Sequence, residues 1–300
     1  MNKTSEFDIA GSAVSDMRVA ITGAAGSLAA DIIPALLEAC VELVCVDRTK
    51  PAKDLGLEWH ICSINDRDAL KAAFVGCDAV VHLAGIPLED EWERILENNI
   101  DGTQAVLDTA LHAGINKVVL ASSIHATGFV GIPADEAVPA DVRVRPNTFY
   151  GVSKAALEAL GSYYHDRYAM NVICLRIASR FSEPQNVRML STWLSPEDAG
   201  RLFIAALGPQ ATGFRTIWGV SRNARGYLSA EAGEAIGFHA LDDAEVFAEQ
   251  ISEEAESNPL AAESQWDRKY LGGVFSSDEP PLQPYSIDNQ EPHQTEGSNK

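Results

Sequence analysis

The sequence predicts an α/β fold in which a Rossmann-type, doubly wound parallel sheet carries a small C-terminal substrate-binding lobe. Short, continuously apolar runs alternate with segments of helical periodicity from residue 17 to residue 177. A glycine-bearing turn directly follows the first apolar run. The chain has 300 residues, of which 46% are hydrophobic, and this is enough to bury one large core with a smaller lobe.

The alternating pattern predicts five strands and four helices. The apolar runs place strands at residues 17–22, 41–46, 79–83, 117–121 and 172–176. The helical patterns lie at residues 28–39, 67–75, 91–112 and 150–168. After residue 177 the pattern loosens, and a helical segment at 195–207 and a strand-like segment at 213–218 suggest the small lobe.

Charge and composition exclude several classes of partner. The net charge is −20, which disfavours nucleic acids and anionic membranes because their phosphates would be repelled. No apolar run approaches the roughly 20 residues that span a bilayer, and the N-terminal residues lack a hydrophobic signal core. We therefore expect a cytoplasmic protein. The five cysteines form no CxxC pair, so we expect buried free thiols and no metal site.

The turn at residues 22–29 (TGAAGSLA) has the features of a phosphate-binding loop. Gly23 allows a tight turn, and Gly26 lets the backbone approach a pyrophosphate. The helix that follows offers free N–H groups and the positive end of its dipole. Ala29 is small enough for close packing of helix and strand. The turn therefore predicts dinucleotide binding.

Asp47 ends the second strand, where a carboxylate accepts hydrogen bonds from the adenosine ribose and repels a 2′-phosphate. This favours NAD over NADP as the cofactor. Arg48 stands beside it and leaves NADP open, because an arginine there can hold that phosphate.

Tyr150 and Lys154 are the candidate proton-transfer pair. At positions i and i+4 of a helix they lie on one face, and the ammonium is expected to lower the pKa of the phenol. The tyrosine could then take a hydroxyl proton as hydride leaves the same carbon. Ser123 follows the fourth strand and could bind the reacting oxygen, whereas Ser122 is interpreted as structural.

These motifs, with HLAG at 82–85 and NNIDGT at 98–103, resemble the extended short-chain dehydrogenases/reductases of the NAD-dependent epimerase/dehydratase group. The resemblance covers residues 18–275 and implies that Ser123, Tyr150 and Lys154 are catalytic, that Asn99 buttresses the site and that His82 is structural. It implies cofactor contacts from Gly23, Ala25, Gly26, Ser27, Leu28, Asp47, Ser63, Ile64, Leu83, Ala84, Gly85, Asn99, Tyr150, Lys154 and Ile177. Ser63 stands where the family usually has an acidic residue.

The chain then divides into four parts. Residues 1–16 are expected to be a flexible N-terminal tail, and residues 17–178 the NAD-binding Rossmann domain with the catalytic residues. Residues 179–275 are expected to form the substrate-binding lobe and the remaining sheet and helix elements. Residues 276–300 are expected to be a disordered acidic tail. The sequence from Asp242 to the end contains 14 acidic and 3 basic residues.

Within this group the runs at 188–195, 123–125 and 271–275 resemble the uronate dehydrogenases. This resemblance implies NAD-dependent oxidation of C1 of a hexuronate, such as glucuronate or galacturonate, to an aldarolactone. It implies that Arg188 holds the sugar carboxylate, a task suited to a guanidinium fork. Ser123, His125 and Ser179 would contact the sugar.

The substrate remains open because three positions depart from that pattern. Ile124 and Pro87 replace polar sugar contacts, and Arg180 adds a second positive group near the pocket. The alternatives are a dehydrogenase of another acidic or phosphorylated sugar and a nucleotide-sugar epimerase or dehydratase. A cofactor-sensing regulatory protein is a third possibility, although such proteins often lose the Tyr–Lys pair. A homo-oligomer is expected through the helix at 91–112 and the Tyr150 helix.

Overall fold

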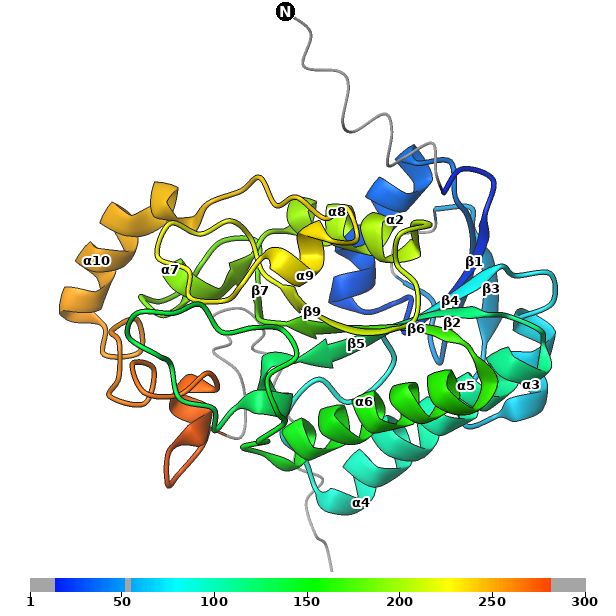
Figure 1. Ribbon diagram of the computed structural model, residues 1–300, viewed down its shortest axis with the longest axis horizontal. Coiled ribbons are helices and arrows are strands. Elements are labelled where there is room, and N and C mark those ends of the chain that lie inside the picture. Colours follow the sequence, from blue (N-terminus) through cyan, green and yellow to red (C-terminus); the bar gives the residue numbers. More distant parts are fainter. Residues whose placement is uncertain (1–13, 52–54, 282–300) are drawn as a thin grey trace, which may run out of the picture.

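The structure, a computed structural model, describes residues 14–51 and 55–281 (Figure 1). Its centre is a parallel sheet of seven strands in the order β3-β2-β1-β4-β5-β6-β9. The strands are β1 (Arg18–Thr22), β2 (Glu42–Asp47), β3 (Glu58–Ile61), β4 (Ala79–His82), β5 (Lys117–Ser123), β6 (Asn171–Ile177) and β9 (Phe214–Gly219). The order changes direction between β1 and β4, which confirms the predicted doubly wound fold.

Helices cover both faces of the sheet. Helices α3, α5 and α6 lie along one face and α2 and α8 along the other (Figure 1). The helices are α2 (Ser27–Glu38), α3 (Arg67–Ala73), α4 (Trp92–Ile95), α5 (Gly102–His112), α6 (Phe149–Tyr168), α7 (Met189–Thr192), α8 (Pro196–Leu207), α9 (Glu231–Glu234) and α10 (Ala248–Ser257). Short 3₁₀ turns occupy Ile124–Thr127, Ala244–Phe247 and Gly273–Ser276, and β7 (Ser179–Arg180) pairs with β8 (Trp193–Leu194).

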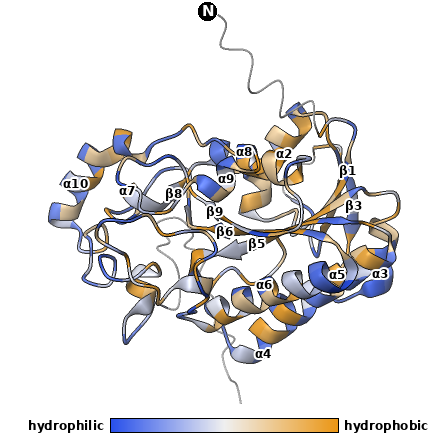
Figure 2. Cartoon of the chain, viewed as in Figure 1, coloured by the Kyte–Doolittle hydropathy of each residue, from blue (hydrophilic) through white to orange (hydrophobic). Residues whose placement is uncertain are grey.

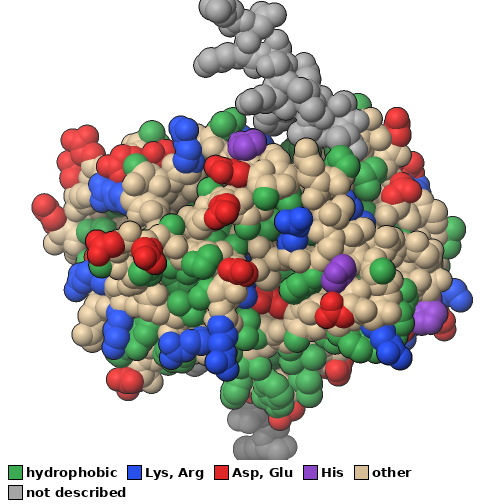
Figure 3. All heavy atoms as spheres, in the orientation of Figure 1, with side chains coloured by type: hydrophobic (Ala, Val, Ile, Leu, Met, Phe, Trp, Pro, Cys, Tyr) green, Lys and Arg blue, Asp and Glu red, His purple; other side chains and the backbone are tan. Residues whose placement is uncertain are grey.

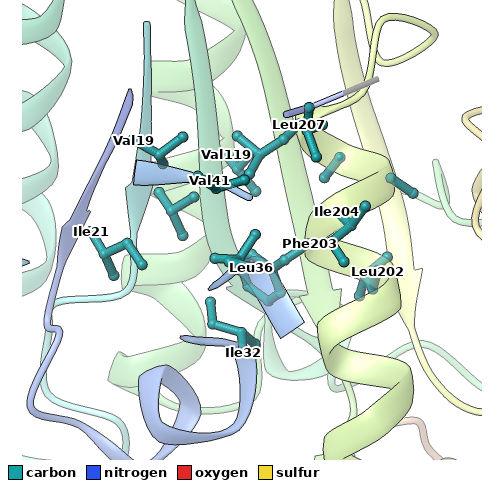
Figure 4. Close-up of a cluster of buried hydrophobic side chains, with 14 of the residues drawn as sticks. Val19, Ile21, Ile32, Leu36, Val41, Val119, Leu202, Phe203, Ile204 and Leu207 are labelled. Carbon is teal, nitrogen blue, oxygen red and sulfur yellow. The ribbon is translucent and has the colours of Figure 1, made fainter. Parts of the chain in front are cut away.

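The α2–α8 layer packs on the sheet through aliphatic and aromatic side chains. Leu36 of α2 and Phe203 of α8 are fully buried and lie against the sheet residues drawn in Figure 4. A Cβ on Gly200 of α8 would lie 2.6 Å from the Cβ of Ala35, so the two helices approach closely there. The strands are mainly hydrophobic, as expected for a sheet covered on both faces (Figure 2).

The helical segment at 195–207 and the strand-like segment at 213–218, which we expected in the small lobe, belong to the helix layer and the sheet of the main fold. Strand β9 pairs with β6 as the last strand of the sheet, and α8 packs beside α2. Periodicity predicts the type of an element but not its neighbour, which explains the difference. Of the remaining elements after β6, β7, α7 and α10 lie beyond the carboxyl ends of the strands, and β8 pairs with β7, whereas α9 packs beside β9 (Figure 1). The division of the chain at residue 178 stays a prediction.

Four local features of the structure differ from the sequence expectations. Strand β3 was not predicted, because it is a short edge strand of half-exposed residues, among them Glu58 and His60. The predicted helix at 91–112 is interrupted by a π-helical segment, Leu96–Asp101. Ser123 does not follow β5 but is its last residue. Of the cysteines, which are all free, Cys40 is exposed rather than buried.

The acidic surplus is visible on the surface at one end of the molecule. Figure 3 shows acidic side chains over the end that carries α10, where Glu249, Glu253 and Glu256 are exposed. Most of the two predicted tails, residues 1–13 and 282–300, lies outside the described residues. In the part of the chain that the structure describes, no helix is long and apolar enough to cross a membrane, and no cluster of three or more His, Cys, Asp or Glu side chains could hold a metal ion.

Candidate active site

A cavity of about 450 Å³ lies at the carboxyl ends of the strands. Residues near the end of the described chain, among them Asp267 and Phe275, also line it. It brings together nearly all of the predicted site residues. Those that line it are Gly23, Gly26, Ser27, Leu28, Asp47, Ser63, Ile64, Leu83, Ala84, Gly85, Ser123, His125, Tyr150, Lys154, Ile177, Ser179 and Arg188. Ala25 and Asn99 do not line the cavity but form hydrogen bonds to Asp47 and Ile86, which do.

The turn between β1 and α2 fits a dinucleotide pyrophosphate. Gly23 has a φ of +75°, and a Cβ there would lie 2.6 Å from the backbone nitrogen of Ala84. Only glycine therefore permits this approach of the turn to the end of β4. Gly26 caps α2 without a side-chain hydrogen bond, and the first turn of α2 carries no acidic residue. The helix start is thus open to an anion.

Asp47 stands where the adenosine ribose of a dinucleotide is expected. Its Oδ2 accepts a hydrogen bond of 3.0 Å from the backbone N–H of Ala25, and its Oδ1 accepts one from Thr49. These donors hold the carboxylate at the cavity wall while lone pairs remain for ribose hydroxyls. Ala25 therefore contributes through its backbone N–H. A carboxylate held in this way fits the adenosine ribose of NAD.

Asn99 connects the cofactor side of the cavity to the Tyr150 helix. Its Oδ1 accepts from the backbone N–H of Ile86 at 2.7 Å, and its amide nitrogen donates to the Ile86 carbonyl and to Ser153 Oγ. Ser153 in turn donates to the carbonyl of Tyr150. Asn99 lies in the π-helical segment, a type of turn that is frequent at functional sites. Asn99 thus joins the backbone of Ile86 to the start of the Tyr150 helix through Ser153, and its supporting role in the site stays a prediction.

Ser123, Tyr150 and Lys154 line the same cavity. Lys154 Nζ lies 5.4 Å from the centroid of the Tyr150 ring and donates a hydrogen bond of 2.6 Å to the carbonyl of Ala121. Ser123 Oγ accepts from the backbone N–H of His125, which leaves its own proton free to be donated. The three groups have the arrangement needed to exchange a proton with a hydroxyl.

Burial controls the pKa values of this pair. It raises the pKa of Tyr150 to about 12, against the smaller opposite effect of the Ser123 hydroxyl. It lowers the pKa of Lys154 to about 8, while Cys174 and Glu158 act in the other direction. In the protein without its cofactor the direction for Tyr150 is thus opposite to the expected lowering of its pKa by the ammonium. Desolvation penalises the charged form of each group, the phenolate of Tyr150 and the ammonium of Lys154.

A buried ion pair joins β6 to α6, the helix that carries Tyr150 and Lys154. Arg176 donates to Glu158 through Nε (2.9 Å) and Nη2 (2.8 Å), and Ser122 donates to Glu158 Oε1 at 2.6 Å. This confirms the structural role of Ser122. His82 is also structural, because its Nδ1 and Nε2 contact Thr22 and Thr103, and burial lowers the pKa of the imidazole to about 3.

Arg188 lies in the other half of the cavity and is held by three groups. It donates to Ser179 Oγ at 3.3 Å and to the carbonyl of Leu271, and its Nε lies 3.7 Å from Asp267 Oδ1. Within the described residues this buried Nε has no hydrogen-bond partner. Asp267 also accepts from the backbone N–H of Val274. The guanidinium is thus fixed in place and partly neutralised.

His125 presents a hydrogen-bond acceptor to this half. Ser276 donates its proton to the carbonyl of Gly128 and accepts from the Asn147 amide nitrogen. Asn147 therefore turns its Oδ1 to His125, and the histidine carries its proton on Nδ1. Burial first, and then the charge of Arg188, lower the pKa of His125 to about 4. The ring is neutral, and its Nε2 is an acceptor.

The three departures noted in the sequence lie at different places. Pro87 and Ile124 line the cavity and add apolar surface. Arg180 also lines the cavity but contacts the phosphate-loop helix, where it forms an ion pair with Asp31 and a hydrogen bond to Ser27. Its charge is therefore paired with a carboxylate of α2.

Several contributing residues were not identified from the sequence. Glu89 accepts from the backbone N–H groups of Phe149 and Tyr150 at 3.1 and 2.9 Å, and so caps the catalytic helix. Asp267 contacts Arg188 from 79 positions further along the chain. No local pattern predicts such contacts. Asn186 lines the cavity, and its position just before Arg188 is a signal that could have been used.

Comparison with known proteins agrees with this geometry. Residues 19–226 match the NAD dependent epimerase/dehydratase family. The chain belongs to this family. It is therefore an oxidoreductase of the NAD-dependent type that acts on CH–OH groups, and the predicted family, enzyme class and cofactor are confirmed.

Relatives in this family include enzymes for different sugars. A uronate dehydrogenase of Pseudomonas syringae pv. tomato is 33% identical over 88% of this chain and 94% of its own length. An NAD-dependent glucose-6-phosphate dehydrogenase of Haloferax volcanii is 33% identical over 77% of this chain and 96% of its own. A mutant uronate dehydrogenase of Agrobacterium tumefaciens, solved in complex with NAD, superposes with a TM-score of 0.79 at 32% identity, over 89% of this chain and 99% of that one.

Proposed function

We propose that the protein oxidises C1 of a hexuronate, such as glucuronate or galacturonate, to an aldarolactone with NAD. The observation that carries this proposal is the position of Arg188 in the cavity that also holds Ser123, Tyr150 and Lys154. A fixed guanidinium offers paired N–H donors to a carboxylate at one end of the sugar, while the other end meets the proton-transfer groups. The similarity to uronate dehydrogenases supports the same substrate class.

In this reaction Tyr150 takes the proton of the C1 hydroxyl, and Ser123 donates a hydrogen bond to the same oxygen. Oxidised NAD, when bound, supplies the acceptor for the hydride and a positive charge that favours the phenolate. Lys154 holds the nicotinamide ribose and adds its own charge to the site. His125 Nε2 accepts a hydrogen bond from a sugar hydroxyl, and the Ser179 hydroxyl donates or accepts one.

A second substrate is favoured by a specific observation. Pro87 and Ile124 give the cavity apolar surface at two positions, and Asp267 partly neutralises Arg188. A buried hydroxyl left without a partner costs about 1–3 kcal/mol, which is enough to change the preferred sugar. A dehydrogenase of another acidic or phosphorylated sugar is therefore the alternative. A nucleotide-sugar epimerase or dehydratase would recycle its cofactor and would accumulate no NADH.

The test is NADH formation with a panel of glucuronate, galacturonate, glucose and glucose 6-phosphate. The uronates should give the highest kcat/KM, and Arg188→Met should lower it about 100-fold for uronates but much less for glucose. Arg215→Met, at an exposed position near the amino end of β9, is the matched control. Oxidation of neutral or phosphorylated sugars alone would overturn the substrate. No net NADH with any sugar would favour an epimerase.

The predicted homo-oligomer also remains a proposal. Trp92 and Phe149 are partly exposed and stack edge to face, and Tyr163 and Tyr168 are exposed on α6. Exposed aromatic side chains are enriched at interfaces. Sedimentation equilibrium should therefore report a dimer or a larger assembly.

A further inference from the structure

Arg180 links the small second sheet to the first turn of the phosphate-loop helix. It lies on β7, whose partner is β8, and its side chain reaches α2. Nη1 forms an ion pair of 2.6 Å with Asp31 Oδ2, and Nη2 donates to Ser27 Oγ at 2.6 Å. Ser27 and Asp31 are separated by one helical turn and hold the guanidinium from one face of α2.

The place where this cation is held already attracts anions. Ser27 is the first residue of α2, next to Gly26, and the free N–H groups of a helix start favour negative charge. Arg180, Ser27 and Gly26 line the same cavity. A guanidinium in this position adds a full positive charge and further N–H donors to the partial charge of the helix end.

The contacts of Arg180 use only part of its hydrogen-bonding capacity. A guanidinium has five N–H donors, and within the described residues the side chain of Arg180 donates to one oxygen on Asp31 and one on Ser27. The side chain is 21% exposed, so it can meet a ligand in the cavity without first being uncovered. Asp31 and Ser27 each occupy one N–H, and further donors remain on both terminal nitrogens.

We propose that Arg180 is a cofactor-binding residue that pairs with the pyrophosphate of NAD, opposite the backbone N–H groups of the phosphate loop. Strand β7 would then contact both ligands. Arg180 would hold the cofactor, and Ser179, the residue before it, contacts Arg188 at the proposed sugar site. The inference goes beyond the proposed function, and it stands whether or not the substrate is a uronate.

The test measures ligand binding by isothermal titration calorimetry. NAD and ADP-ribose contain the pyrophosphate, whereas adenosine lacks it. Arg180→Met should weaken NAD and ADP-ribose about tenfold to hundredfold, while adenosine binding stays within about twofold. The loss for ADP-ribose should shrink at high salt, because partly exposed charges are screened. Arg215→Met, far from the strand ends that face the cavity, is the matched control and should bind all three as the wild type does.

Asp31→Asn provides a second variant, should Arg180→Met disturb the α2 contact. Removing this carboxylate takes a negative charge away from the site, so ADP-ribose should bind at least as tightly as before, with adenosine unchanged. The proposal is overturned if Arg180→Met binds ADP-ribose as the wild type does, or if it loses adenosine to the same extent. Weaker ADP-ribose binding by Asp31→Asn would also overturn it.

Discussion

Replacing Glu158 by glutamine should destabilise the protein strongly. Glu158 and Arg176 side chains are only 6% and 3% exposed, and the carboxylate accepts three hydrogen bonds, two from Arg176 and one from Ser122. Glutamine keeps the shape but leaves the arginine charge uncompensated in the interior. Breaking a buried ion pair in this way costs about 3–5 kcal/mol.

Because about 1 kcal/mol shifts the Tm of a domain somewhat smaller than this one by about 2–4 °C, the Glu158→Gln variant should melt about 6–20 °C lower. Differential scanning calorimetry measures this change, and Glu253→Gln on the exposed face of α10 serves as the control. The same variant should lower the pKa of Lys154 below about 8, because Glu158 raises it. A Tm within about 1 °C of the wild type would refute the role of the pair.

Three further predictions concern the site. Gly23→Ala should weaken NAD at least about tenfold in a binding titration, because its Cβ would lie 2.6 Å from Ala84 N at a φ of +75°; unchanged affinity would contradict the close approach. Glu89→Gln should lower kcat about tenfold with the KM for NAD unchanged, since one N–H at the start of the Tyr150 helix loses its acceptor; steady-state kinetics decides this, and a wild-type kcat would refute it. The pKa of Lys154 is about 8 in the folded protein and 10.5 when free, so between these values the unfolded chain binds more protons and the contribution of Lys154 to stability rises with pH; urea unfolding at pH 8 and pH 10 should show a smaller rise for Lys154→Met, and an equal rise would contradict the shift.

Local chemistry explains which parts of the fold could be predicted. The turn with Gly23 and the helix with Tyr150 carry their own signals, and parallel strands bring their carboxyl ends to one edge of the sheet. Gly23, Asp47 and Tyr150 therefore lie in one cavity, as predicted. Strand β3 could not be predicted, because an edge strand with charged residues lacks the apolar run of its neighbours.

Long-range contacts and burial explain what could not be predicted in the site. Arg180 meets Ser27 and Asp31 across 153 and 149 positions of sequence, and only the folded chain brings them together. The direction of the Tyr150 pKa shift depends on how completely the phenol is buried, which the spacing of Tyr150 and Lys154 does not contain.

Transfer of deuterium from C1 of the sugar tests the central proposal most directly. Glucuronate labelled with deuterium at C1 is incubated with the protein and NAD, and the reduced cofactor is analysed by mass spectrometry. We predict one deuterium in the reduced cofactor for each lactone formed, and a loss of about 100-fold to 10,000-fold in rate for Tyr150→Phe. Reduced cofactor without deuterium, or no reduction with any hexuronate, would contradict oxidation at C1.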